Sequence, residues 1–452
     1  MTDFGATGSH PHELRRGRSL FDLDDRTRRR NRSEGAFRWL GIGAIALSMV
    51  FIVILLGTIV ARGLPAFTQT TITIEVPLDA AVLDPNGTGD PEVIRSVLTF
   101  GYAPLIERGL AGTVAATGVE TELTSSQLPQ LLSPGVAATL RDMVAADPSL
   151  VGQTVQVEAL ASGRADGYLK GRVTRESLAR DTNLSPAHLD VLDALVEQDL
   201  ARRAFNWDFI LGADASESRP EEAGIGVAMI GSFYMMLTVL LLALPIGVAA
   251  SIYLEEFAPQ NRLTDLIEVN ISNLAAVPSI VFGILGLAAF IQFAHLPQSA
   301  PLVGGLVLTL MTLPTIIIST RAALKAVPPS IRDAALGVGA SKMQSVFHHV
   351  LPLAMPGILT GLIIGLAQAL GETAPLLLIG MVGFIASNPP DGFIDGFVSP
   401  NSAMPAQIYE WAKRADPAYY ERAWGGIIVL LLFLLVMNVL AVLLRRRFER
   451  RW

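Results

Sequence analysis

The chain has 452 residues, of which 51% are apolar and 17% are charged. Ordinary soluble proteins carry roughly 25% charged residues, so this composition indicates a membrane protein. The formal net charge of −7 argues against a nucleic-acid-binding protein, because the surface of such a protein is basic. The sequence contains no cysteine, which excludes disulfide bonds, thiolate metal sites and a cysteine nucleophile.

Six apolar runs are long enough to cross a membrane, since about 20 apolar residues span a hydrocarbon core of ~30 Å. They cover residues 39–61, about 225–254, about 271–293, about 302–320, 358–382 and 424–444. Five runs have no charged residue in their central stretch, and the fifth contains Glu372 past its middle. The sequence therefore predicts an all-α polytopic membrane protein with six transmembrane helices. The first run is too long for the apolar part of a cleaved signal peptide, so we expect it to be retained.

Lysine and arginine gather on one side of the predicted spans, and these residues mark cytoplasmic loops. The first 38 residues contain nine arginines, residues 321–357 contain four basic residues, and five arginines follow the sixth run. The loop 294–301 on the other side contains none. We therefore expect a multi-pass protein with both termini in the cytoplasm, as basic tails at 1–38 and 446–452.

A long segment, residues 62–223, separates the first two runs and is expected outside the membrane. It contains 12 basic and 23 acidic residues. Residues 71–76 alternate as a half-buried strand does. Ser133 and Ser185 each precede a proline and an apolar pattern of helical spacing, which predicts two capped helices. The segment is therefore predicted to be a folded external domain, of mixed α/β or mostly helical structure, without a catalytic or metal-binding cluster.

The segment 328–356 between the fourth and fifth runs reads as two short helices on the cytoplasmic side. Ser330 is placed to cap the first helix, and Gly337 and Gly339 end it. Such an element suits docking into a groove of a soluble partner, although an ordinary loop between helices would look similar.

This segment resembles the "EAA" loop of ABC importer permeases. The resemblance rests on the spacing of six residues: Asp333, Ala334, Ala335, Gly339, Leu351 and Pro352. Asp333 stands where the family pattern has Glu, and His349 stands where it has Ile. The resemblance implies the type I importer permease fold, with five helices of the core in residues 224–445, and a loop that seats on a separate ATP-hydrolysing subunit.

Four further stretches resemble the PstA-type permease family of phosphate-specific ABC importers. They are residues 253–258 (YLEEFA), 273–283 (NLAAVPSIVFG), 371–377 (GETAPLL) and 407–412 (QIYEWA). Many members of that family have an arginine where this chain has Gln368. The resemblance implies a bacterial inner-membrane subunit that works with a PstB-like ATPase, a second, PstC-like permease and an external, PstS-like phosphate-binding protein.

Several polar residues within the predicted spans are candidates for the translocation path or its gate. They are Glu372, Gln368, Thr373, Thr312 and Arg321. An intramembrane carboxylate usually faces a polar interior, but it repels phosphate, so we expect Glu372 to serve as a gate or to pair helices rather than to bind substrate. Spans two to five each contain one proline and are expected to be bent.

The sequence thus predicts a permease subunit of an ATP-driven phosphate importer, surrounded by membrane lipid. The absence of the nucleotide-binding pattern G-x-x-x-x-G-K-[ST] indicates that this chain is not an ATPase, so ATP and Mg²⁺ belong to the partner and this chain is expected to bind no cofactor. Two alternatives stay open: a permease for another oxyanion or small solute, and a membrane-anchored sensor whose external domain carries the function.

Overall fold

The computed structural model describes residues 25–85, 87, 89–178, 184–381 and 392–448. Most of the predicted N-terminal tail, part of the C-terminal tail and the end of the fifth run at Val382 lie outside these residues. The chain divides into two units, Met1–Thr58 and Ile59–Trp452. The described part of the first unit belongs to one helix, α1 (Asp25–Gly63), which begins before the predicted span and whose apolar side chains are mostly exposed.

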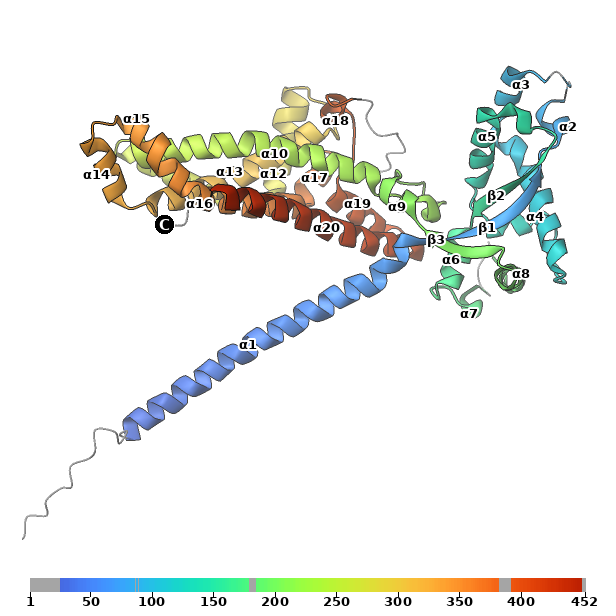
Figure 1. Cartoon of the computed structure of the whole chain (residues 1–452), viewed down its shortest axis with the longest axis horizontal. Coiled ribbons are helices and arrows are strands. Elements are labelled where there is room, and N and C mark those ends of the chain that lie inside the picture. The colour runs from blue at the N-terminus through green and yellow to red at the C-terminus, as the bar shows by residue number, and fades with distance from the viewer. Residues whose placement is uncertain (1–24, 86, 88, 179–183, 382–391, 449–452) are drawn as a thin grey trace, which may run out of the picture. The chain divides into compact units, whose positions relative to one another are not determined.

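A domain lies between α1 and α10 in the chain and is called the inserted domain below. It contains a three-stranded antiparallel sheet in the order β2-β1-β3 (Figure 1). The strands are β1 (Thr68–Pro77), β2 (Thr154–Leu160) and β3 (Ala201–Phe205). Ile72, Ile74 and Val76 point into the domain core, which confirms the strand predicted at 71–76.

Short helices surround this sheet. They are η1 (Leu64–Phe67), α2 (Ala80–Leu83), α3 (Pro91–Arg95), η2 (Thr99–Tyr102), α4 (Ala103–Thr117), η3 (Leu128–Leu131), α5 (Val136–Ala146), η4 (Pro148–Leu150), α6 (Gly163–Leu169), α7 (Arg175–Leu178), α8 (Pro186–Glu197), α9 (Trp207–Leu211) and η5 (Pro220–Glu222). Ser185 caps α8 with His188 in a capping box, as predicted. The predicted cap at Ser133 is wrong, because Gly135 occupies the N-cap of α5 and the Ser133 hydroxyl donates to Glu222 instead.

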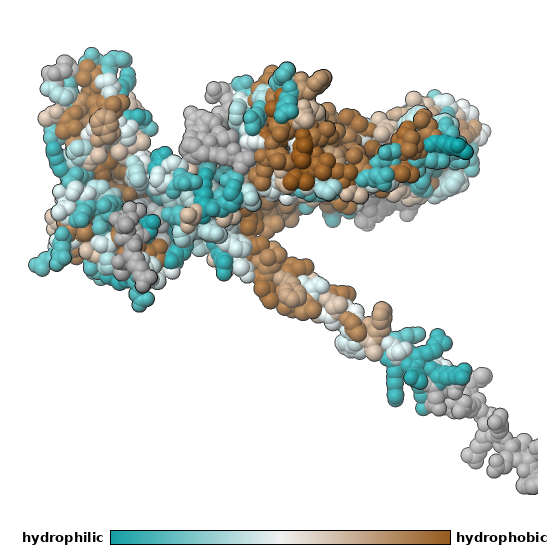
Figure 2. Space-filling model, turned by 180° about the vertical axis from the view of Figure 1, so that it is seen from behind, coloured by the Kyte–Doolittle hydropathy of each residue, from teal (hydrophilic) through white to brown (hydrophobic). Residues whose placement is uncertain are grey.

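The remainder of the chain forms a helical core. Its elements are α10 (Gly226–Ile252), η6 (Tyr253–Phe257), α11 (Arg262–Ala275), α12 (Ser279–Gly286), η7 (Leu287–Phe293), α13 (Pro301–Lys325), α14 (Pro329–Gly337), α15 (Lys342–Ser345), η8 (Val346–Val350), α16 (Leu351–Gly371), α17 (Ala374–Leu378), α18 (Asp395–Val398), α19 (Met404–Lys413) and α20 (Pro417–Phe448). In the described part of the chain, five helices are long and apolar enough to cross a membrane, or six if one bent pair counts as a single span. Hydrophobic residues gather over the helices of the core in Figure 2.

The third predicted run is not one straight span. Helix α11 ends at Ala275 and α12 begins at Ser279, and the two segments are bent by 100°. Pro278 stands at the N-cap of α12 because proline starts a helix more readily than it continues one. A bend was expected in this run at its proline, and the structure places it there, as a break between two helices rather than a kink within one.

The fifth predicted run is interrupted as well. Helix α16 ends at Gly371, and Glu372 has extended backbone dihedral angles of −82° and 129°. Pro375 stands in the first turn of the next short helix, α17, instead of bending a continuous one. Glu372 thus follows the end of a helix, which corrects the expectation that it lies past the middle of one. Pro245 and Pro314 do lie inside their helices, α10 and α13.

Helices α10, α13 and α16 approach one another closely at glycine positions. A Cβ atom added at Gly357 would lie 2.6 Å from Ala323, and one added at Gly361 would lie 2.5 Å from the Cβ of Ser319. On the other side of α13, a Cβ at Gly304 would lie 2.5 Å from the sulfur of Met235. Small residues permit such close packing of membrane helices, where dispersion rather than water exclusion stabilises the contact.

Replacing Gly361 with alanine is expected to destabilise the core, because its new Cβ would overlap the Ser319 side chain. Overpacking of this kind costs about 1–3 kcal/mol. The measurement is the thermal unfolding midpoint of the purified chain in detergent. Adding Ser319→Gly should restore much of the loss, and Gly371→Ala is the control because its Cβ would meet no atom within 4 Å. An unchanged midpoint for Gly361→Ala would contradict this packing.

Candidate functional site

The predicted docking loop comprises α14, α15 and η8. Gly339 lies between the first two with φ of +90°, a left-handed conformation that glycine adopts without strain. Its N–H donates to Leu336, and the N–H of Ala340 donates to Ala335. Ser341 then opens α15 through a capping box with Gln344. The expected cap at Ser330 is wrong, because Pro328 occupies the N-cap of α14 and Pro329 its first position.

The loop carries an exposed apolar surface, which is called the loop face below. Its residues are Leu336, Val338, Met343 and Phe347, and Val338 is 86% exposed. Asp333 and Ala334 are exposed beside it, whereas Ala335 is buried against the core. Leu351 and Pro352 are half-buried in the first turn of α16. The six residues of the family pattern thus lie in one compact element, part of it exposed and part packed.

A buried ion pair fixes this loop to the end of α10. Arg332 of α14 donates through Nε and Nη2 to the Glu256 carboxylate at 3.0 and 2.6 Å. The same guanidinium donates to the carbonyls of Val327 and Leu324 at 2.8 and 3.0 Å. Glu256 lies in the stretch 253–258, but its contact with the docking loop was not predicted, because the two residues are 76 positions apart.

Arg321, a predicted path residue, is engaged in a second ion-pair cluster close to the first. Its guanidinium pairs with Glu255 at 3.3 Å and with Glu268 of α11 at 2.6 Å. Lys325 approaches the same Glu255 at 3.6 Å. In this conformation Arg321 therefore joins α10, α11 and α13 rather than presenting a free cation.

The other predicted path residues fall into two environments. Gln368 is exposed on the last turn of α16, and Glu372 and Thr373 are half-buried at the break that follows. Among the described residues, the Glu372 carboxylate has no hydrogen-bond or ion-pair partner. Thr312 is fully buried, and its hydroxyl donates to the carbonyls of Leu308 and Thr309 in its own helix. Gln368, Glu372 and Thr373 thus lie around the end of α16, close in sequence, and Thr312 lies in the packing between helices.

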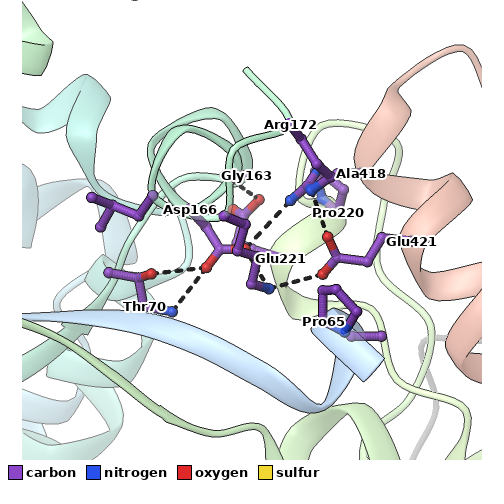
Figure 3. Close-up of polar contacts among 12 residues, drawn as sticks. Pro65, Thr70, Gly163, Asp166, Arg172, Pro220, Glu221, Ala418 and Glu421 are labelled. Atoms are coloured by element: carbon purple, nitrogen blue, oxygen red, sulfur yellow. Dashed lines mark hydrogen bonds and ion pairs between the residues drawn. The ribbon is translucent and has the colours of Figure 1, made fainter. Parts of the chain in front are cut away.

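A third group of charges joins the inserted domain to α20, as Figure 3 shows. Lys170 is almost fully buried and pairs with Asp166 at 2.7 Å and with Glu421 of α20 at 2.8 Å. Arg172 pairs with the same Glu421 at 2.5 Å, and Asp166 accepts from the N–H and hydroxyl of Thr70. This junction was missed in the sequence. The only local signal was a charged pair directly before the last apolar run.

Arg422, the next residue of α20, satisfies backbone groups at the same junction. It donates to the carbonyls of Ala66, Pro220 and Glu221, and its guanidinium lies 5.3 Å from the Phe209 ring centroid. The side chain of Glu221 is buried and accepts from the N–H of Gly163 at 3.0 Å. Burial raises the pKa of Glu221 above its ordinary value, although the hydrogen bonds it accepts oppose the rise.

A bundle of apolar helices with an exposed loop fixed to its end defines a polytopic membrane protein with a docking element. Residues 243–452 match the family of binding-protein-dependent transport system inner membrane components. Residues 24–179 match a domain of unknown function (DUF3333).

Several curated relatives share this core. The phosphate transport system permease protein PstA 1 of Mycobacterium tuberculosis (strain H37Rv) is 31% identical over 234 residues, which are 51% of this chain and 73% of the relative. PstA of Yersinia pestis is 30% identical over 49% of this chain and 73% of its own length. The probable ABC transporter permease protein YqgI of Bacillus subtilis is 32% identical over 48% of this chain and 76% of its own length. An inward-facing structure of the MetNI methionine ABC transporter aligns with 50% of this chain and 95% of its own length, at 16% identity and with a TM-score of 0.37.

The chain belongs to the family of binding-protein-dependent transport inner-membrane components, among its PstA-type permeases. Members of this family are the membrane subunits of ABC transporters, so the chain is a multi-pass inner-membrane transport component rather than an enzyme. Its resemblance to that family is thereby confirmed.

Loss of the Glu256 charge is expected to loosen the docking loop. Hydrogen bonds to charged groups contribute roughly 1.5–3 kcal/mol, and Glu256→Gln leaves Arg332 with neutral acceptors only. Because the chain has no cysteine, a spin label on Val338→Cys reports the mobility of α14 directly. We expect a more mobile spectrum in Glu256→Gln. Glu255→Gln is the matched control, since Glu255 pairs with α13 and not with α14. Equal spectra in the two variants would contradict the role of Glu256.

The raised pKa of Glu221 predicts a pH-dependent stability. An acid that holds its proton more tightly when folded stabilises the fold at low pH. That contribution is lost as the pH rises from the ordinary glutamate pKa through the raised one. Glu221→Gln should therefore lose less thermal stability than the wild type across this window. The exposed Glu217→Gln is the control and should follow the wild type. Parallel curves for Glu221→Gln and the wild type would refute the effect.

Proposed function

We propose that this chain is a transmembrane permease subunit of an ATP-driven importer that moves inorganic phosphate across the inner membrane by alternating access. The observation that carries the proposal is the identity of about 31% to permeases named for phosphate transport, over 51% of this chain. The stretch 371–377, which resembles the same permeases, lies at the break after α16 and supports the same substrate.

The loop face is the proposed seat of the ATPase subunit. Leu336, Val338, Met343 and Phe347 offer apolar anchors to a groove, while Asp333 and the small Ala334 lie beside them. Arg332 and Glu256 then carry the motion of the ATPase into α10, because a charge-paired helix moves with the element that holds it. ATP and Mg²⁺ bind in that partner, and this chain binds no cofactor of its own. In this proposal the partner is PstB-like.

The remaining assembly follows from the same proposal. A second, PstC-like permease completes the pathway, and a PstS-like phosphate-binding protein delivers substrate from outside. Both termini and the loop face lie in the cytoplasm, because lysine and arginine gather near them. The inserted domain then lies on the external side of the membrane.

At the break after α16, polar groups line the proposed path. Gln368 and Thr373 provide neutral hydrogen-bond donors that can pass an oxyanion without trapping it. Glu372 has no partner among the described residues and would repel phosphate, so its proposed role is that of a gate. Thr312 and Arg321 line the proposed path only in a conformation in which α13 has moved away from its neighbours. In this structure the Thr312 hydroxyl is hydrogen-bonded within its own helix and Arg321 is ion-paired with Glu268.

Gln368 also supports a second candidate, a permease for another oxyanion or a small solute. A membrane arginine is the bidentate partner that phosphate favours, and this chain has an amide at that position. A membrane-anchored sensor is less well supported, because residues 243–452, most of the helical core, match a transport family.

Phosphate uptake by a starved bacterial host that lacks its own phosphate permease tests the proposal, with this chain and its partner subunits supplied. Wild type should restore uptake. Asp333→Lys should abolish both uptake and co-purification of the ATPase, because it reverses the charge at the loop face. Glu372→Gln should alter uptake while the ATPase still co-purifies. If the wild type binds the ATPase and moves another solute but no phosphate, the substrate assignment fails.

A further inference from the structure

The short helix α9 at the edge of the inserted domain has one buried and one exposed apolar side. Phe209 is fully buried and packs edge-on against Phe67, with ring centroids 5.3 Å apart. Trp207 and Leu211, four residues apart and so on one face, are 62% and 71% exposed. Phe205, at the end of β3, is half-exposed and contacts the Trp207 ring at 4.7 Å between centroids. Phe205, Trp207 and Leu211 are called the aromatic edge below.

The aromatic edge lies level with the points where two long apolar helices begin. A Cβ added at Gly226, the first residue of α10, would overlap the Leu211 carbonyl. One added at Gly425, at the start of the apolar part of α20, would lie 2.8 Å from the Phe209 ring. Helix α9 therefore sits where α10 and α20 enter the membrane, rather than out on the distal part of the inserted domain.

The chemistry of these side chains fits the boundary between lipid headgroups and acyl chains. Tryptophan is enriched there because its ring is apolar while its indole N–H remains hydrogen-bonded in the polar layer. A short helix that exposes Trp and Leu at that level can bury these side chains among the acyl chains while its polar groups stay in the headgroup layer. The exposed Asp208 and Arg203 flank the edge and supply the polar side of such an arrangement.

We infer that the aromatic edge inserts into the lipid bilayer at the membrane surface that faces the inserted domain. The occupant is lipid, because α9, which carries most of the exposed edge, adjoins α10 at Gly226 and α20 at Gly425, and both helices are long and apolar enough to cross a membrane. The inserted domain is then held against the bilayer at α9 as well as through the junction of Lys170 with Glu421. This inference rests on the membrane location of the chain and not on its transported substrate.

Site-directed labelling of the cysteine-free chain tests the inference in lipid nanodiscs. Trp207→Cys and Leu211→Cys each receive a bimane fluorophore, and the bilayer contains lipids with a nitroxide near the headgroup end of the acyl chain. We expect both labels to be quenched several-fold more strongly than a label at Phe100→Cys. Phe100 is the matched control, an aromatic residue 75% exposed on η2, which packs against α4 and α5 in the distal part of the inserted domain.

Two results would overturn the inference. One is quenching at positions 207 and 211 no greater than at position 100. The other is quenching of all labels by a water-soluble nitroxide in the isolated chain, with protection at 207 and 211 appearing only when the other subunits are added. That second result would make the edge a protein interface. Because two independent positions are read, a folding defect in one variant leaves the test intact.

Discussion

The close approach of α13 to α10 and α16 is the constraint on which the rest of the core depends. No water competes for contacts within a bilayer, so helices associate through packing, and small residues permit the shortest distances. Most of the glycines in these contacts have room for little more than a hydrogen atom. They are Gly304 and Gly305 of α13, which face α10, and Gly357, Gly361 and Gly365 of α16, which face α13. A core packed at this density moves as blocks and not by gradual deformation. The ion pairs at the end of α13 therefore have rigid helices on which to act.

In the described part of the chain, clusters of paired charges lie at two ends of the helical core. Glu255, Glu256, Arg321 and Arg332 fix the docking loop to the helices at one end, and Asp166, Lys170, Glu421 and Arg422 fix the inserted domain at the other. A buried charge is costly unless it is paired and hydrogen-bonded, and each of these groups has at least one hydrogen-bond or ion-pair partner. The same physical device thus joins the transmembrane helices to the two segments that lie outside them.

The sequence predicted what local composition determines and missed what long-range contact determines. Apolar runs of about 20 residues revealed the membrane helices, and Ser185 was recognised as a cap from the proline and the apolar pattern of helical spacing that follow it. Ser133 looked the same locally, but its hydroxyl bonds to Glu222, 89 residues further on. The pair of Lys170 with Glu421 spans 251 residues, and its one local signal was the charged pair directly before the last apolar run. The docking loop was recognised because its family pattern is itself local, whereas the residue that holds it, Glu256, was not.

The prolines of the third and fifth runs predicted bent helices but not complete breaks, because hydropathy counts side chains and not backbone hydrogen bonds. The first break is apolar in sequence and the second contains Glu372 and Thr373. The helices that follow the two breaks meet in the fold: a Cβ at Gly283 of α12 would lie 2.7 Å from Pro375 of α17. Irregular backbone at membrane depth must be buried in protein or face a polar space. Part of this requirement is met beyond α17, where Ser299 donates through its hydroxyl to the Gly380 carbonyl and through its N–H to that of Ile379. The half-buried Glu372 carboxylate has no such partner among the described residues. A polar path through the core is therefore easier to form at this break than in the middle of a helix.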